Sequence, residues 1–568
     1  MKYLVTSALP YANGPLHFGH LAGAYLPADI YTRHLRISGK EVVHISGSDE
    51  HGVAIMLNAK KVEKDYKSYV DDWHQDHKEL FKSFNVDFDY FGQTSADYHE
   101  KEVISWFNEI HKKGFVVPKE MQQLQCQDCE NHLPDRFVTG TCYECDYQEA
   151  RGDECPNCGI IIDPVKLLNP TCEICQSKNV SEVTVTQYYL NLKKYHTEFR
   201  TWFEKQTHWR NTVWPFVDSL TKEGLMDRAI SRDLDWGIDV PLAEAAGKKL
   251  YVWFDAPIGY VSNTKKWIEE NNRNEDYIKD WWQNPDTKIV NFIGKDNIIF
   301  HCIIFPAMSM ISGKVNATYD VPANQFLNLQ GKQFSKSSGW YVDAKEALQK
   351  FGSDALRYYL ISILPEHSDS SFTWEGFQAK VNNELANNIG NLINRSLKFW
   401  EKNWPDGIDS SQFKSFESNS LYQEVINVSK KHSELINQKE MKKALEEIMR
   451  LGHLSNEYFS NEAPWAQIKE DPKLAAQTIA HTGCLIVCIG TLLAPHLPNL
   501  SENILSHFGT ISDDFKRRLY TGDLNVLFEI FNDSFKPTKT PKALVPKIPD
   551  EVIEKLQEDL VAIESRAK

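Results

Sequence analysis

The feature that most restricts the fold is a short apolar run that leads through a turn to two closely spaced histidines. Residues 3–9 are apolar enough for a buried strand, residues 10–14 are turn formers, and a helical pattern follows His20. A helix that begins after such a turn points its first N–H groups over the edge of the sheet. His17 and His20 can both donate to one anion there, and Gly19, which has no Cβ, lets a flat base approach the backbone. The stretch therefore predicts a phosphate site.

Strand-like and helix-like stretches alternate along much of the chain. Residues 42–52 (VVHISGSDEHG) indicate a second strand with an acidic turn, and residues 288–308 indicate a strand, a glycine turn and a helix. Such alternation predicts a parallel sheet with helices on both faces, in which the turns after the strands open onto one crevice. Residues 249–262 (KLYVWFDAPIGYVS) are rich in aromatic and β-branched residues, and alone they indicate an ordinary core strand. Pro27 lacks a backbone donor and is expected to kink or delay the first helix.

Four C-x-x-C pairs include eight of the 11 cysteines. Pairs at this spacing are typical of zinc held by thiolates, and four sulfurs per ion leave no open position, so the metal is expected to be structural. Sequential and nested pairing both fit the short gaps between the pairs. Metal-binding cysteines indicate a reducing compartment, and we predict a cytoplasmic protein. The pairs are Cys126/Cys129, Cys142/Cys145, Cys155/Cys158 and Cys172/Cys175.

Length and charge limit the class of protein. A chain of 568 residues suggests about three or four domains, and 42% hydrophobic residues suffice for folded cores. The net charge of −15 argues against a broadly basic nucleic-acid binder, so we expect no DNA partner and only local RNA contacts. The longest apolar run, residues 484–497, is too short for a membrane span and contains Gly490 and Pro495, which predicts a buried helix and no membrane partner.

A second motif, LNLQGKQFSKSSGW at residues 327–340, lies far downstream of the two histidines. Small hydroxyl side chains around a lysine, with a glycine on each side, are typical of a loop that closes a cation over phosphates. In this order HFGH and QFSKS resemble the HIGH and KMSKS signatures of class I aminoacyl-tRNA synthetases, and ALPYANGPLHFGH resembles the methionyl-tRNA synthetases. The chain departs from the family pattern at Gln333, where the signature has lysine. Lys332, next to it, could supply that contact.

The resemblance implies a two-step reaction. L-Methionine is activated by ATP with Mg²⁺ to methionyl-adenylate, pyrophosphate is released, and the methionyl group passes to the 2′-hydroxyl of the terminal adenosine of tRNA(Met), including the initiator. Attack on the α-phosphorus develops charge on the phosphate oxygens, so positioned donors and cations are needed, and no enzyme nucleophile. His17, His20 and Lys336 are the expected catalytic residues.

The same resemblance implies the binding residues. It places ATP on Tyr11, Asn13, Gly14, His17, Gly19, His20, Gly294, Lys295, Asp296, Ser335, Lys336 and Ser337. It places methionine on Leu9, Tyr11, Asp49, Trp253, Ala256, Pro257, Tyr260 and His301. Asp49 would take the ammonium group, and aromatic rings would favour the thioether. Phe305 stands where some relatives carry tryptophan, which keeps an aromatic face but changes the pocket's shape. Single-zinc relatives resemble the chain over Cys142, Cys145, Cys155 and Cys158, which favours nested pairing, with a second zinc on Cys126, Cys129, Cys172 and Cys175.

From about residue 376 the pattern is helical throughout and predicts a bundle. By periodicity alone Asn391, Arg395 and Trp465 would be structural. Asn391 and Arg395 nevertheless lie four apart on one helical face, and Trp465 lies at an expected helix start. Unpaired RNA bases are read by stacking on aromatic rings beside polar groups, and the resemblance implies that these three residues read the anticodon.

These features predict an α/β, doubly wound parallel-sheet (Rossmann-type) catalytic domain, split by a zinc-binding insertion and followed by an all-α helix-bundle anticodon-binding domain. Two other classes stay possible: a small nucleotidyltransferase with an H-x-G-H turn, and a non-enzymatic zinc-bearing RNA adaptor. The predicted units are the first catalytic half (1–117), the connective insertion (118–230, with zinc knuckles at 126–175), the second catalytic half with the SKS loop (231–375), the anticodon-binding domain (376–540), and a linker with a C-terminal tail (541–568).

Overall fold

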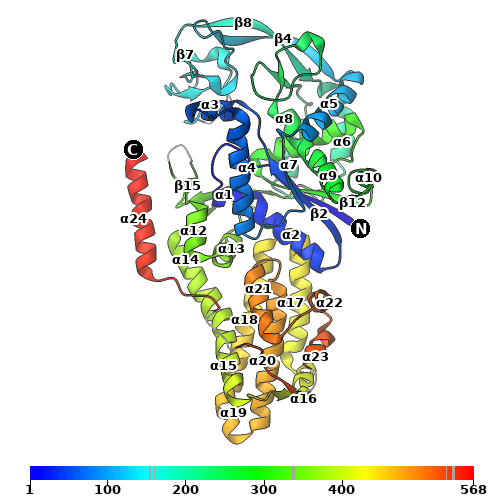
Figure 1. Ribbon diagram of the computed structural model, residues 1–568, viewed down its shortest axis with the longest axis vertical. Helices are drawn as coiled ribbons and strands as arrows, with labels where there is room; N and C mark the ends of the chain where they lie inside the picture. The colour runs from blue at the N-terminus through cyan, green and yellow to red at the C-terminus, as the bar shows by residue number, and fades with distance from the viewer. Residues whose placement is uncertain are drawn as a thin grey trace.

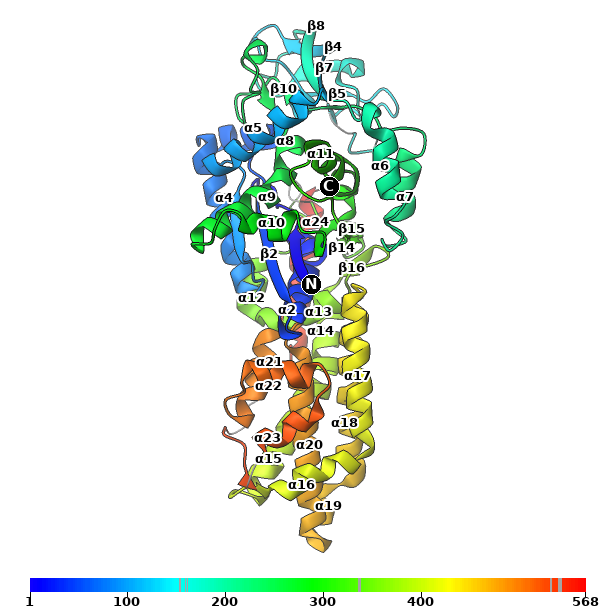
Figure 2. The same ribbon diagram turned by 90° about the vertical axis from the view of Figure 1, so that its right-hand side faces the viewer.

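The computed structural model describes the chain except residues 153–154, 159, 161, 336–338, 532–533, 540–543 and 568. The molecule is elongated, as Figures 1 and 2 show. An α/β body occupies the middle, a β-hairpin lobe lies at one end, and a helical bundle forms the other end. The HFGH turn in the α/β body therefore lies between two structurally distinct extensions.

The centre of the α/β body is a sheet of five parallel strands. Their order is β13 (Ala323–Asn324), β12 (Thr287–Gly294), β1 (Lys2–Ser7), β2 (Glu41–Ser48) and β3 (Tyr90–Gln93). The early strands extend from β1 in one direction and the late strands extend from it in the other. This creates a topological switch point between β1 and β12, where open α/β sheets bind their ligands. The parallel, doubly wound sheet expected from the sequence is present.

A π-helical turn accommodates Pro27. The helix begins as α1 (Phe18–His20), widens over Leu21–Tyr25 and continues as α2 (Leu26–Ile37). Leu26 N–H donates to the Leu21 carbonyl in this wider turn, just before the residue that has no N–H. The expected disturbance at Pro27 is therefore a local π-turn, and the helix proceeds beyond it.

The prediction of a strand at residues 249–262, which composition favours, is wrong. Only β11 (Lys249–Leu250) is extended, and the chain continues as α8 (Val252–Asp255), a 3-10 turn (Ala256–Ile258) and α9 (Gly259–Glu270). Phe254, Ile258 and Val261 are buried at helical spacing. Helix α9 packs on β2, where Asn263 Nδ2 donates to the Ser46 carbonyl at 2.9 Å. Tertiary burial overrides the β-propensity of the aromatic residues.

The cysteine pairs lie on a long antiparallel hairpin that projects from the α/β body (Figure 1). Its arms are β4 (Val116–Cys126) and β8 (Val180–Leu190). The chain that connects the two arms forms a small separate sheet of β5 (Val138–Thr141), β6 (Ala150–Arg151) and β7 (Leu168–Cys172). The chain leaves the main sheet after β3 and returns at β12, so the lobe interrupts the α/β body as expected.

The C-terminal bundle is helical. Its main helices are α15 (Asn391–Asn403), α17 (Ser420–Asn437), α18 (Met441–Glu462), α20 (Pro472–Leu493) and α21 (Pro498–Leu505). Helix α20 is the one described helix that is long and apolar enough to cross a membrane, yet 94% of its most apolar window is buried in the bundle. The buried helix predicted from the apolar run at 484–497 is therefore confirmed in α20. The last helix, α24 (Asp550–Ala567), packs against α14 (Trp374–Lys380).

A buried arginine joins the helix after HFGH to the bundle. Arg357, on α13 (Ser353–Ser362), is fully buried and donates to Asp29 Oδ2 at 2.7 Å. Its Nε also donates to the His496 carbonyl at 2.7 Å, between α20 and α21. Because one guanidinium contacts both parts, the bundle is held at a defined position relative to the HFGH turn.

Candidate functional site

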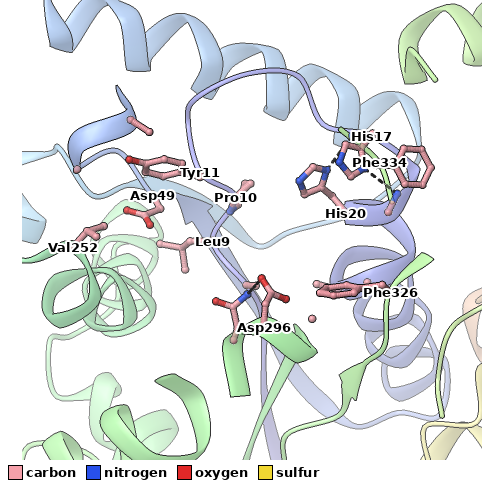
Figure 3. A pocket seen from close by; sticks show the side chains of 18 of the residues that line it. Leu9, Pro10, Tyr11, His17, His20, Asp49, Val252, Asp296, Phe326 and Phe334 are labelled. Atoms are coloured by element: carbon pink, nitrogen blue, oxygen red, sulfur yellow. Dashed lines mark hydrogen bonds between the residues drawn. The ribbon is translucent and has the colours of Figure 1, made fainter. Parts of the chain in front are cut away.

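A cavity of about 620 Å³ opens at the switch point between β1 and β12. It brings together turns from both halves of the sheet and the segment before the SKS lysine (Figure 3). Predicted residues on its wall are Leu9, Tyr11, His17, Gly19, His20, Asp49, Trp253, Gly294 and Asp296, and Gln333 and Phe334 complete that side. Two motifs that are far apart in the sequence therefore meet at one cavity, as the phosphate-site hypothesis requires.

The two histidines have their ring nitrogens oriented by the backbone. Gly19 N–H donates to His17 Nδ1 at 3.2 Å, and His17 N–H donates to His20 Nδ1 at 3.1 Å. The ring centroids are 3.8 Å apart. Because each Nδ1 accepts a hydrogen bond, a neutral ring carries its proton on Nε2. The arrangement suits two neighbouring N–H donors to one anionic group.

The opposite end of the cavity is acidic. Asp49 Oδ1 is covered from solvent and has no hydrogen-bond partner among the described residues. Burial and then the nearby Asp255 carboxylate raise the pKa of Asp49 well above its usual value. Asp255 is itself paired, since His51 Nδ1 lies 2.5 Å from Asp255 Oδ2. A cation placed beside Asp49 would satisfy the orphan oxygen and favour the ionised form.

Four of the residues predicted to hold methionine lie behind the cavity wall. Tyr260 and His301 are buried and joined by a hydrogen bond of 2.7 Å between Oη and Nε2. Burial lowers the pKa of His301 to about 4, so its ring is neutral at pH 7. Pro257 is buried and Ala256 is half-buried, and neither lines the cavity. Phe305 packs in the core against Trp106, Tyr260 and Trp282.

Several residues predicted to hold ATP also make other contacts. Asn13 Oδ1 accepts from Asn58 Nδ2 at 2.9 Å, and the Gly14 carbonyl accepts from His77 Nε2 at 2.9 Å. These contacts hold the turn against α3 (Val53–Lys61) and α4 (Tyr66–Ser83), away from the cavity. Lys295 Nζ pairs with Asp369 at 2.7 Å.

The SKS segment is described up to its serine. Ser335 N–H donates to the Trp340 carbonyl at 2.9 Å, directly after the cavity-lining Phe334. Lys336 and Ser337, predicted as phosphate-binding residues, lie outside the residues that the structure describes.

Sequence reasoning missed a part of the wall that comes from the cysteine-rich lobe. Asp135 and Arg136 line the cavity beside Tyr11 and Tyr251. Asp135 has a φ of 51°, and its carboxylate pairs with Arg232 Nε at 3.3 Å. No spacing rule points to this turn, because its approach to the cavity depends on how the whole lobe folds back.

Comparison with known proteins decides the family. A family model described as tRNA synthetases class I (M) matches residues 3–397, and one described as the anticodon binding domain of methionyl tRNA ligase matches residues 405–565. The chain belongs to the methionyl class I aminoacyl-tRNA synthetases. This membership excludes the small-nucleotidyltransferase and non-enzymatic adaptor alternatives.

Relatives of this synthetase are similar to it in sequence or fold over most of its length. It is 41% identical to the methionine–tRNA ligase of Thermococcus kodakarensis over 89% of this chain and 70% of the relative. It is 38% identical to that of Rubrobacter xylanophilus over 89% of this chain and 90% of the relative. A structure of Mycobacterium tuberculosis methionyl-tRNA synthetase in complex with methionyl-adenylate shares the fold, with a TM-score of 0.76 at 21% identity over 96% of this chain and 99% of that one.

Eight cysteines of the synthetase form two clusters of four, and in each cluster all sulfurs lie within 4.8 Å of one another. The outer cluster brings Cys126 to 3.5 Å from Cys175 and Cys129 to 3.8 Å from Cys172. Around a tetrahedral zinc with bonds of about 2.3 Å, sulfurs are about 3.8 Å apart. The inner cluster has similar spacings between Cys142, Cys145, Cys155 and Cys158. The described geometry groups the pairs as nested and fits zinc.

We expect a Cys126→Ser variant of the synthetase to bind one zinc fewer than the wild type and to melt at a lower temperature. The Cys142→Ser variant should also lose one zinc, because the clusters share no ligand. Metal content measured by mass spectrometry, beside a thermal melt, checks both variants. Loss of both ions from the Cys126 variant would contradict two independent sites.

The far end of the bundle brings the three predicted anticodon residues into one region of the synthetase. Asn391 and Arg395 are exposed on α15, and Trp465, on α19 (Pro464–Glu470), is 42% exposed. The Arg395 guanidinium lies 5.7 Å from the Trp465 ring centre and 5.3 Å from that of Phe459. A cation beside an exposed ring offers both a stacking face and a polar edge.

Proposed function

We propose that this chain activates L-methionine with ATP and transfers it to tRNA(Met), using the cavity at the switch point for both steps. The observation that carries the proposal is that HFGH, the QFSKS segment and Asp49 all contribute to that cavity. The first two supply donors for phosphate, and the third supplies a carboxylate for an ammonium group. An amino acid and ATP can therefore be held side by side.

In the first step Asp49 would hold the methionine ammonium group, which leaves the α-carboxylate directed at the triphosphate. A carboxylate oxygen attacks the α-phosphorus, the bond to the bridging oxygen breaks, and pyrophosphate leaves with that electron pair. His17 and His20 would donate from Nε2 to the charge that develops on the phosphate oxygens. Lys336 and Mg²⁺ would neutralise the departing pyrophosphate.

Methionine selection would come from the wall that joins Leu9, Tyr11 and Trp253. Trp253 is 47% exposed at this wall, and its ring centre lies 4.5 Å from that of Phe300. Aromatic edges favour a polarizable thioether over a branched aliphatic side chain. Tyr260 and His301 would act from behind this wall, where their mutual hydrogen bond fixes both rings.

We assign a structural role to the metal ions and divide the chain into the following units. Four thiolates per zinc leave no position for substrate, so the ions would stabilise the lobe that carries Asp135 and Arg136. The assigned units are the catalytic halves (1–117 and 231–375), the connective insertion (118–230), the anticodon-binding domain (376–540) and the C-terminal tail (541–568).

Replacing Trp465 with alanine is expected to lower kcat/KM for tRNA aminoacylation by about 10- to 100-fold, because one stacked base contributes roughly 1–3 kcal/mol. Methionine-dependent pyrophosphate exchange should not change, since the residue lies at the far end of the bundle. Phe216→Ala is a matched control, because Phe216 is also an aromatic residue with 42% exposure. An equal loss in both assays would show that Trp465 acts through folding.

The direct test of the proposed function is ATP–pyrophosphate exchange with each amino acid in turn, followed by charging of tRNA. We expect exchange with methionine to exceed that with leucine or isoleucine by orders of magnitude, and charging only of tRNA(Met). Exchange that depends equally on leucine would refute the assignment of substrate.

A further inference from the structure

A phenylalanine from the downstream motif lies directly on the first histidine of HFGH. The rings of Phe334 and His17 are 4.5 Å apart between centroids and inclined by only 8° (Figure 3). Phe334 stands where the KMSKS signature has methionine, which cannot form a parallel ring stack. The contact therefore belongs to this chain's version of the motif.

The same ring covers the backbone on which a nucleotide would lie. A Cβ built on Gly19 would approach the Phe334 ring to 3.4 Å and the His17 ring to 3.0 Å. An atom placed on this side of Gly19 therefore meets the Phe334 side chain. In this arrangement the glycine's open face is filled by the protein itself.

Phe334 is held there by a short hairpin. Strand β14 (Leu327–Leu329) pairs with β15 (Lys332–Gln333) through Asn328 and Leu329, and the Ser335–Trp340 backbone bond lies just beyond Phe334. The stack on His17 therefore connects this hairpin directly to the HFGH turn. Moving the ring away would remove this stack, although β14 and α1 would remain in contact.

We propose that Phe334 occupies the nucleotide seat by stacking on His17 until ATP displaces it. This inference rests on the proposed function, because it takes the Gly19–His17 surface as the seat for ATP. The stack competes with the nucleotide, so part of the intrinsic affinity for ATP is used to separate the two rings. Binding of ATP would thereby replace the direct contact between the Phe334 and His17 rings.

The test is the affinity for Mg-ATP alone, measured by titration calorimetry without methionine so that no turnover occurs. Phe334→Ala should bind ATP about two- to tenfold more tightly than the wild type, because an aromatic stack of this size no longer competes. Phe334→Tyr keeps the ring and should bind like the wild type, and Phe334→Met should bind more tightly. The KM for methionine should stay constant in all three variants, because Asp49 lies at the opposite end of the cavity (Figure 3).

Unchanged or weaker ATP binding by both Phe334→Ala and Phe334→Met would overturn the proposal. A thermal melt of each variant identifies one that fails to fold, and the remaining variant then decides. Failure of the proposed function is a separate result: the wild type would then lack methionine-dependent exchange, whatever the order of the ATP affinities.

Discussion

Asparagine in place of Asp49 is expected to raise the KM for methionine by about 10²–10³-fold. The variant keeps the shape of the side chain but offers no charge to the substrate ammonium group. Breaking a desolvated ion pair by removing one partner costs about 3–5 kcal/mol. Pyrophosphate exchange at saturating ATP measures this KM. Asp239→Asn is the matched control, because Asp239 is an exposed carboxylate paired with Lys249 on the surface.

The Asp49 prediction extends to pH. Burial and the neighbouring Asp255 carboxylate raise the pKa of Asp49 in the empty site, so its carboxyl group retains a proton to higher pH than usual. Methionine binds the ionised form, and its KM should therefore fall as pH rises through this raised pKa. The asparagine variant should lose that dependence. A KM that stays normal in Asp49→Asn would place the ammonium group elsewhere.

The second large effect is expected at Lys336. Alanine there should lower the rate of methionyl-adenylate formation by about 10²–10³-fold while methionine still binds, because a preorganised cation acts on the departing pyrophosphate. Lys336 lies outside the described residues, and the prediction rests on the family motif and on the cavity position of Gln333 and Phe334. The single-turnover rate of adenylate formation and the affinity for methionine, measured separately, distinguish an effect on the reaction from an effect on binding. Lys350, exposed near the end of α12 (Ala344–Phe351), supplies the control Lys350→Ala.

Near-normal exchange in Lys336→Ala would remove the lysine from the mechanism. A variant of Lys332 then becomes informative, since Gln333 replaces the first lysine of the signature. Lys332 Nζ lies 5.4 Å from the centre of the Trp340 ring. That contact places the ammonium group over the Trp340 ring.

The sequence predicted those parts of the site that are formed by residues close together in the chain. The strand, turn and helix around HFGH follow from residues within one short stretch, and the structure contains all three. The downstream strand and glycine turn at Gly294 are also local, and they reach the same cavity. The grouping of cysteine pairs needed the family resemblance, because spacing alone allowed two pairings.

Features that depend on distant contacts could not be predicted. Residues 249–262 have strand-like composition, but their helical burial pattern is decided by packing on β2. Lys295, which is predicted to bind ATP, also pairs with Asp369, and no local signal in the sequence indicates this distant partner. Arg136 reaches the cavity only because the cysteine-rich lobe folds back over it. In each case the deciding partner is remote in sequence, so no local signal marks it.

The central claim is that HFGH and the SKS lysine bind the same nucleotide from two sides. A crystal structure of the chain with Mg-ATP tests this most directly. We predict one ATP in the switch-point cavity, with phosphate oxygens within hydrogen-bond distance of both His20 and Lys336. A structure in which these two residues face separate cavities, so that a single ATP cannot contact both, would contradict the account.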